Sequence, residues 1–254
     1  MRVAITREVS PSIAHCELTH LIRAPIDFEC ARAQHQQYED LLEELGCKHL
    51  RLPAESELPD SVFVEDTAIV LDELAVITRP GAESRRTETS SVAAVLKQYR
   101  RLVHIEPPGT LDGGDVLRIG KILYVGLSRR SNREGIGQLR NIVAISGYSV
   151  TVVELHDCLH LKSAVTQVAD DTLLINRKWV DADVFGSMRL IEVAPSEPFG
   201  ANTLRIGKTL VYPEAFPETR KHLEAHGIVV QTVDASELAK AEGGVTCCSL
   251  IFTA

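Results

Sequence analysis

The chain has 254 residues, of which 44% are hydrophobic and 24% charged, a composition ordinary for a globular protein. Its formal net charge is -8 and its pI about 5.6, which argues against nucleic acid as the main partner. No apolar run approaches the length of a membrane span, no signal peptide is evident, and six cysteines without Cys-x-x-Cys spacing predict reduced thiols in the cytoplasm.

A unit of two apolar strands with a tight polar turn between them, then a helix, then a third strand, recurs along the chain. It first occurs over 67–78, with its turn at Asp72-Glu73, followed by a helix over 87–99 and a strand over 102–105. Polar turns between apolar runs are typical of hairpins. Three later units are expected. The second has a hairpin over 115–126, a helix over 132–146 and a last strand over 150–154. The third has these elements over 164–175, near 181 and over 189–193, and the fourth over 203–212, 217–226 and 229–233.

The two ends of the chain are expected to form a fifth unit together. The strand 245–252 would lie beside the strand 2–6, with a helix over 30–45 and a strand over 48–52. Repetition at a few tens of residues indicates a radial or solenoid assembly, and pairing of the two ends favours a ring with strands inward and helices outward. No shift of composition separates domains, so we expect one domain over 1–254 whose polar strand ends meet at an axis.

An acidic segment before the first hairpin is the first candidate for a binding site. Asp60, Glu65 and Asp66 surround Phe63 in an otherwise apolar stretch. A planar cation such as guanidinium binds paired carboxylate oxygens and an aromatic face, so these residues suit such a ligand. A solvated turn, a helix cap, or a metal site at Glu65 and Asp66 would also account for them.

Two aspartates and a histidine are candidates for proton transfer. Asp112 and Asp115 bracket two glycines just before the second hairpin, and His160 lies between two leucines. The aspartates could approach a ligand or orient a histidine, although a tight turn explains the same pattern. His160 is a general acid and base if a carboxylate fixes its tautomer, and a buried core histidine otherwise.

Arg85 and Arg130 follow the second strand in two different units, at equivalent places. Both could therefore point to one side of the axis and bind a ligand carboxylate through their forked guanidinium groups. Ion pairing near the start of a helix is the other explanation for these arginines.

The stretch 242–252 contains the candidate nucleophile. Gly243 and Gly244 allow a sharp turn or a close approach, and 245–252 is expected to be a short buried strand. Alternation along a strand sends Cys247 and Cys248 to opposite faces, so at most one serves a given site, and we take Cys247 as the nucleophile. Burial of both as small hydrophobic side chains is the alternative.

Taken together, these motifs resemble the dimethylarginine dimethylaminohydrolase family of the guanidino-group modifying superfamily. The matching stretches are Phe-Val-Glu-Asp at 63–66, Arg-Pro-Gly-Ala-Glu-Ser-Arg-Arg at 79–86, Thr-Leu-Asp-Gly-Gly-Asp at 110–115, His-Leu-Lys-Ser at 160–163 and Gly-Gly-Val-Thr-Cys at 243–247. They span most of the chain in the family's order. The resemblance implies an α/β fold, a five-bladed pseudo-symmetric α/β-propeller of strand-strand-helix-strand repeats, which agrees with the repeats counted above.

The resemblance also implies a role for each candidate residue. Cys247 would be the nucleophile, His160 the acid and base, and Asp112 the carboxylate partner of His160. The substrate-binding residues would be Asp60, Glu65 and Asp66 around the guanidinium, Phe63 packed nearby, Arg85 and Arg130 at the α-carboxylate, Leu18 in a mobile lid, and Glu242. Glu242 stands where the family commonly has Asp, so it bears on the size of the side chain that the site accepts.

The implied activity is hydrolysis of asymmetric dimethylarginine or monomethylarginine to citrulline and a methylamine. The reaction would pass through a covalent thiouronium on the cysteine and need no metal or organic cofactor. Another small guanidino or hydroxyguanidino amino acid is the alternative substrate, and a non-catalytic thiol protein that senses oxidant or binds metal is the alternative of another class. The expected partner is a small molecule, without nucleic acid or membrane, and a homodimer is left open.

Overall fold

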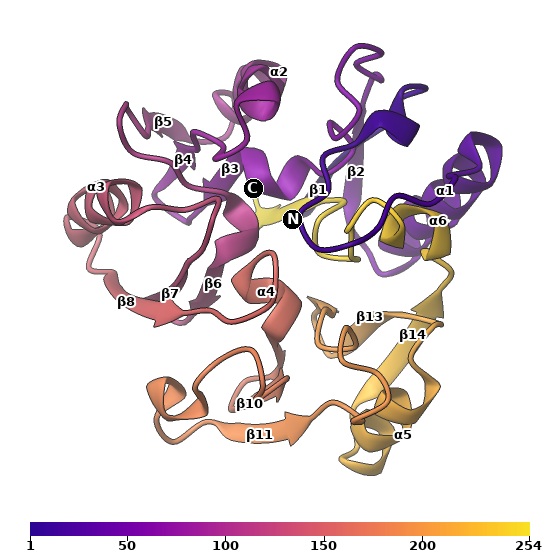
Figure 1. Ribbon diagram of the computed structural model, residues 1–254. Helices are drawn as coiled ribbons and strands as arrows, with labels where there is room; N and C mark the ends of the chain where they lie inside the picture. The colour runs from indigo at the N-terminus through magenta and orange to yellow at the C-terminus, as the bar shows by residue number, and fades with distance from the viewer.

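The protein is a ring of five three-stranded sheets, described by a computed structural model over residues 1–254 (Figure 1). We call each sheet a blade. In every blade the middle strand pairs antiparallel with the first strand and parallel with the third. A helix or helical turn lies between the middle and third strands. This arrangement confirms the expected five-bladed α/β-propeller.

The blades follow one another along the chain, and the last one joins the two ends. The first four blades are β3 (Ala68–Val70), β4 (Leu74–Ile77) and β5 (Arg101–His104); β6 (Val116–Ile119), β7 (Ile122–Leu127) and β8 (Ser149–Glu154); β9 (Val165–Ala169), β10 (Thr172–Ile175) and β11 (Arg189–Glu192); and β12 (Leu204–Ile206), β13 (Thr209–Pro213) and β14 (Val229–Val233). The closing blade consists of β15 (Leu250–Thr253), β1 (Arg2–Arg7) and β2 (Lys48–Leu52). In its register Val3 lies opposite Phe252 on one side and Lys48 on the other.

The four longest helices lie on the outside of the ring, whereas the short helix α4 (Leu161–Ala164) lies near its centre (Figure 1). The α-helices are α1 (Phe28–Glu44), α2 (Thr89–Leu96), α3 (Arg133–Ala144), α4 (Leu161–Ala164), α5 (Pro217–Ala225) and α6 (Ser236–Ala239), and the 3-10 turns are η1 (Ile13–His15), η2 (Val64–Thr67), η3 (Glu83–Glu88), η4 (Gly113–Asp115) and η5 (Ala182–Phe185). Asp27 and Asn132 begin α1 and α3 by accepting the N–H of Cys30 and Gly135. No helix here has both the length and the apolar character required to cross a bilayer.

Apolar side chains hold each blade to the next. The middle strands are the most buried: β4 and β10 are buried along their whole length, whereas the residues of β5 and β14, two of the third strands, are mostly exposed or half-buried. The buried apolar residues form five clusters, each containing side chains from two neighbouring blades. The ring is thus closed by five apolar contacts, which leave the polar ends of the strands at the axis.

The C-terminal strand is shorter than expected. We predicted a strand over 245–252, but β15 begins at Leu250 and the preceding residues form tight turns. In these turns Cys247 N–H donates to the Gly244 carbonyl at 3.1 Å instead of to a neighbouring strand. The argument that strand alternation separates Cys247 from Cys248 was therefore wrong, because a turn sets the directions of both side chains.

Candidate functional site

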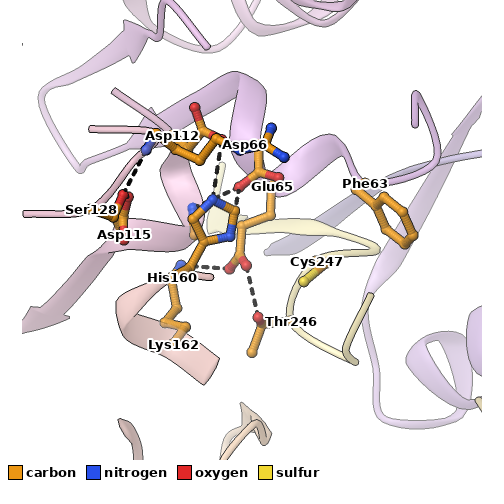
Figure 2. A network of polar contacts seen from close by, with 12 residues as sticks. Phe63, Glu65, Asp66, Asp112, Asp115, Ser128, His160, Lys162, Thr246 and Cys247 are labelled. Atoms are coloured by element: carbon orange, nitrogen blue, oxygen red, sulfur yellow. Dashed lines mark hydrogen bonds and ion pairs between the residues drawn. The ribbon is translucent and has the colours of Figure 1, made fainter. Parts of the chain in front are cut away.

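One place in the repeat supplies the polar residues of the axis: the turn just before the first strand of a blade. These turns carry Glu65 and Asp66, Asp112 and Asp115, His160, Asn202, and Cys247. Figure 2 shows those of the first, second, third and closing blades converging on one site. The pseudo-symmetry of the ring therefore brings together residues that lie up to about 180 residues apart, as in the hydrogen bond between Thr246 and Glu65 (a separation of 181).

His160 is held between two carboxylates. Its Nε2 lies 3.1 Å from Asp112 Oδ2, its Nδ1 lies 3.9 Å from Asp66 Oδ1, and the side chain is only 5% exposed. Burial disfavours the imidazolium, but the charges of Asp66, Asp115 and Asp112 outweigh burial and raise the pKa of His160 to about 9. The histidine is therefore protonated at neutral pH and can act as a proton donor.

Asp115 supports the histidine from behind. Its Oδ2 accepts the hydroxyls of Ser128 and Ser131 at 2.6 Å each, and its Oδ1 accepts the Leu161 N–H at 3.0 Å. Burial raises the pKa of Asp115 to about 6. Because Leu161 follows His160 directly, Asp115 fixes the backbone from which the imidazole extends. The sequence allowed either aspartate of this motif to orient a histidine, and the structure shows that Asp115 does so through the backbone at Leu161.

Cys247 lies in a turn with its sulfur toward the axis (Figure 2). Its Sγ accepts the Gly244 N–H at 3.3 Å. Burial, then the charges of Glu65 and Asp66, raise the pKa of Cys247 to about 12. The thiol form therefore dominates in the free protein. Cys248 is a buried member of an apolar cluster, and Cys247, which is less buried, packs against the same cluster.

A chain of polar contacts positions Glu65 beside this turn. Lys162 Nζ pairs with Glu65 Oε1 at 2.5 Å, and the Thr246 hydroxyl donates to Glu65 Oε2 at 2.7 Å. Asn202 donates to the Thr246 hydroxyl and accepts the Thr246 N–H. Asn202 is a functional candidate that we missed. Its place just before β12, equivalent to those of Asp66 and His160, was the available signal.

The two glycine pairs are required by close approach. A Cβ at Gly114 would lie 2.7 Å from His160 Nδ1 and 2.8 Å from Asp66 Oδ1. A Cβ at Gly243 would overlap the ring of Phe63, which is buried against the C-terminal turn. Glycine at these positions therefore lets two backbone segments lie against catalytic candidates.

Arg85 does not lie where we expected. It is buried and pairs with Asp66 at 2.7 Å and with Glu88 at 2.9 Å, while its Nη2 also donates to the Phe63 carbonyl. Its guanidinium is thus fully occupied by protein acceptors and is not free to bind a ligand carboxylate. The expectation failed because the sequence did not show Glu88, one turn later, as its partner. Arg85 instead orients Asp66 and, with His160, keeps the pKa of that carboxyl low despite its burial.

Arg130 and Asp60 both contact one loop, which we call the covering segment (residues 17–21) and which contains Leu18. Arg130 has one side-chain partner, the Thr19 hydroxyl at 3.1 Å, although it is 8% exposed. Asp60 accepts the Glu17 N–H at 3.0 Å and lies near both Arg85 and Arg130. Leu18 packs on the same apolar cluster as Cys247. Asp60 therefore contacts the covering segment, and it lies near Arg85 together with Asp66.

Glu242 also differs from expectation, because its carboxylate binds protein backbone. The N–H groups of Thr19, His20 and Leu21 donate to it at 2.9, 2.5 and 2.6 Å. Glu242 itself has a φ of 58°, which is uncommon for a residue with a side chain. Glu242 therefore connects the covering segment to the turn that carries Cys247, and its side chain is long enough for the carboxylate to contact the backbone of that segment.

One group of side chains is close enough to hold a metal ion. The ligand atoms of Asp66, Asp112 and His160 lie within 4.8 Å of one another. Both aspartates already accept hydrogen bonds, from Gly114 N–H and Arg85 in one case and from Gly81 N–H in the other. The same three groups form the proton-transfer site, so we assign no metal to them.

Comparison with known proteins agrees with this geometry. The family model described as arginine deiminase matches residues 56–201. Among curated proteins, dimethylarginine dimethylaminohydrolases of Streptomyces coelicolor and Pseudomonas aeruginosa are similar to the chain, at 38% identity over 97% of this chain and 95% of the relative, and at 36% over 89% and 90%. A crystal structure of the Pseudomonas aeruginosa enzyme, a cysteine-to-serine variant complexed with citrulline, superposes with a TM-score of 0.93 at 34% identity and covers 98% of each chain.

Proposed function

The chain belongs to the dimethylarginine dimethylaminohydrolase family of guanidino-modifying enzymes, and we propose that it hydrolyses Nω-methylated arginine to citrulline and a methylamine. The observation that carries the proposal is the convergence of three features at the axis: Cys247, a His160 held between two carboxylates, and the carboxylates of Glu65 and Asp66 (Figure 2). A thiol, a proton donor and an anionic cradle are the groups that displacement at a guanidinium carbon requires.

The first step would depend on the substrate's own charge. Cys247 is a thiol in the free protein because burial and two carboxylates raise its pKa to about 12. A guanidinium bound on those carboxylates neutralises them and places a positive charge beside the sulfur, which favours the thiolate. The thiol proton leaves to solvent, and the sulfur attacks the guanidinium carbon held in front of it.

His160 would then serve both halves of the reaction. As an imidazolium it donates a proton to the leaving amine when the carbon–nitrogen bond breaks, which leaves a thiouronium on Cys247. The neutral imidazole next takes a proton from water, and the water oxygen becomes the ureido oxygen of citrulline as the carbon–sulfur bond breaks. Asp112 stabilises the imidazolium and fixes the ring throughout.

The amino-acid end of the substrate would lie under the covering segment. Arg130 is the one site arginine whose guanidinium is largely without protein acceptors, so it suits the α-carboxylate. Asp60 beside it suits the α-amino group. Phe63 would pack near the substrate, and Leu18 and Glu242 would act through closure of the covering segment.

Unsubstituted arginine is the second candidate substrate, because the matching family model is that of arginine deiminase. The structures of an arginine dihydrolase domain from cyanobacteria share the fold at a TM-score of 0.85, but at 17% identity they indicate the fold alone. Two further alternatives are compatible with the same fold: another guanidino amino acid as substrate, or a non-catalytic thiol protein. A citrulline assay distinguishes them, because only an enzyme forms product.

The test is a colorimetric citrulline assay with a panel of guanidines. The panel contains asymmetric dimethylarginine, monomethylarginine, arginine and hydroxyarginine, and Cys247→Ser serves as the inactive control. We expect the methylated arginines to have the highest kcat/KM. A preference for arginine would make the protein a deiminase, and no product with any compound would overturn the enzymatic proposal.

The cytoplasm is the location that we propose, because all six cysteines are unpaired in the fold. Free thiols persist in a reducing compartment. The substrate is a free amino acid derivative, which a cytoplasmic enzyme would meet directly.

A further inference from the structure

A cavity of about 250 Å³ opens from Cys247 on the side of the third and fourth blades. Its walls are the turns around Leu159 and Phe199, the turn around Ala215 after β13, and α6 with Ala239. Half of the residues that line it are hydrophobic, and none is lysine or arginine. Two of the few large apolar side chains exposed on the molecule, Leu21 and Phe199, lie at this cavity. The cavity is thus an apolar space that reaches the nucleophile.

The cavity is separate from the place assigned to the amino-acid end of the substrate. Asp60, Arg130, Asp66 and His160 do not line it. The covering segment spans both regions, since Glu17 and Thr19 contact Asp60 and Arg130, whereas His20 and Leu21 line the cavity. A substrate held at Arg130 and at Cys247 therefore leaves this space for the substituents on its terminal guanidinium nitrogens.

The size of the cavity exceeds what methyl groups need. One water takes about 30 Å³ in the liquid, and a methyl group is of similar size, so two methyl groups would leave most of the 250 Å³ unfilled. An apolar wall gains free energy for each methylene that it covers. A longer uncharged alkyl group would therefore be favoured over methyl.

We propose that this cavity is a subsite for an apolar N-substituent larger than methyl, so that Nω-alkylarginines with short alkyl chains are substrates of the protein. The inference rests on the proposed function. The reaction keeps its balance: the bond between the guanidinium carbon and the alkylated nitrogen breaks, His160 protonates that nitrogen, water supplies the ureido oxygen, and the products are citrulline and an alkylamine.

The test compares Nω-methyl-, Nω-ethyl- and Nω-propylarginine in the citrulline assay. A buried methylene contributes about 0.8 kcal/mol, equivalent to about fourfold. The propyl compound has two more methylenes than the methyl compound, so we expect its kcat/KM to be higher by about 15-fold. Ala239→Phe and Ala215→Phe each fill the cavity from one wall and should abolish this gain, so that kcat/KM for the propyl compound no longer exceeds that for methyl. The matched control is Ala144→Phe, because Ala144 is likewise an exposed last residue of a helix but lies outside the cavity.

Each outcome separates the two proposals. If kcat/KM falls with each added carbon in the wild-type protein, or if the gain survives both cavity-filling variants, the subsite is overturned while the methylarginine activity stands. If methylarginine itself gives no citrulline, the proposed function fails and the subsite fails with it.

Discussion

At the level of single residues, the proposed chemistry depends most on the charge of His160. Three carboxylates around a buried ring raise its pKa to about 9, against the effect of burial. The acid form is therefore present at neutral pH and is lost as the pH rises through about 9. A histidine with an ordinary pKa near 6.5 would be mostly neutral under the same conditions.

Asp112→Asn should lower the pKa of His160, because it removes one of the charges that stabilise the imidazolium while keeping the shape of the side chain. The alkaline fall in kcat should then begin at lower pH. At neutral pH, kcat should drop roughly 5- to 30-fold for the loss of about one to two kcal/mol of charged hydrogen bonding. The measurement is the pH profile of kcat, with the ring titrated by NMR in parallel. An unchanged alkaline limb would mean that another group is the acid.

Arg130→Ala should weaken the use of amino acids selectively. Loss of a buried charged hydrogen bond is about 1.5–3 kcal/mol, so kcat/KM for methylarginine should fall roughly 10- to 150-fold, while that for methylguanidine, which lacks a carboxylate, should hardly change. Arg129→Ala is the control, because Arg129 is the exposed neighbour. An equal fall with both compounds would show that Arg130 has a structural role.

Residue identities were the part of the site most readable from the sequence, and their contacts were the least. Motif and chain order indicated Cys247, His160 and Asp112, and the structure brings all three to the axis. The role expected for Arg85 was wrong because Glu88, one helical turn later, pairs with its guanidinium. The sequence around an arginine does not show whether a protein carboxylate or a ligand will bind its guanidinium. The burial of this pair follows from the packing of the folded ring and is seen only in the structure.

At the scale of elements, the turn 242–247 is the connection between nucleophile and covering segment. Glu242 accepts three N–H groups of that segment, and Cys247 lies five residues later. Closure over the substrate and the position of the sulfur are thus set by one short piece of chain. We had expected a strand here, and the pattern of apolar residues does resemble one, but the two glycines divert the backbone into turns.

Glu242→Gly should release the covering segment, because it removes the carboxylate while suiting the positive φ at this position. We expect faster hydrogen exchange at the amides of Thr19, His20 and Leu21 and a KM raised by about 10-fold, with kcat less affected. Glu242→Gln keeps the length and one acceptor oxygen, so its effect should be intermediate. Unchanged exchange in the glycine variant would show that the three hydrogen bonds do not hold the segment.

At the scale of the whole molecule, the ring was predictable because the strand-strand-helix-strand repeat occurs five times in the sequence. Each hairpin turn and third strand lies within a few residues of its expected place. The role of Asn202 was not predicted, since Asn202 belongs to none of the polar motifs singled out in the sequence. Its place before the first strand of the fourth blade was the available signal, and the structure shows the role itself, because Asn202 holds Thr246 beside Cys247.

We propose that the ring unfolds as one unit, because the closing blade joins both ends of the chain. Phe252 is buried against Tyr99 and beneath Arg100 in the cluster that the closing blade shares with the first blade. Phe252→Ala should lower the free energy of unfolding by about 3–5 kcal/mol, in a single transition by calorimetry and circular dichroism. Thr253→Ala is the exposed neighbouring control. Two separate transitions, or equal effects of both variants, would contradict cooperative closure.

The central claim is that Cys247 attacks the guanidinium carbon, and trapping the intermediate tests it most directly. The protein is mixed with monomethylarginine, quenched in acid during turnover, digested, and mapped by tandem mass spectrometry, with Cys248→Ser and Cys247→Ser in parallel. We predict a thiouronium adduct on Cys247 in the wild type and in Cys248→Ser, with citrulline formed by both, and neither adduct nor citrulline from Cys247→Ser. An adduct on Cys248, or citrulline from a folded Cys247→Ser variant, would contradict the account.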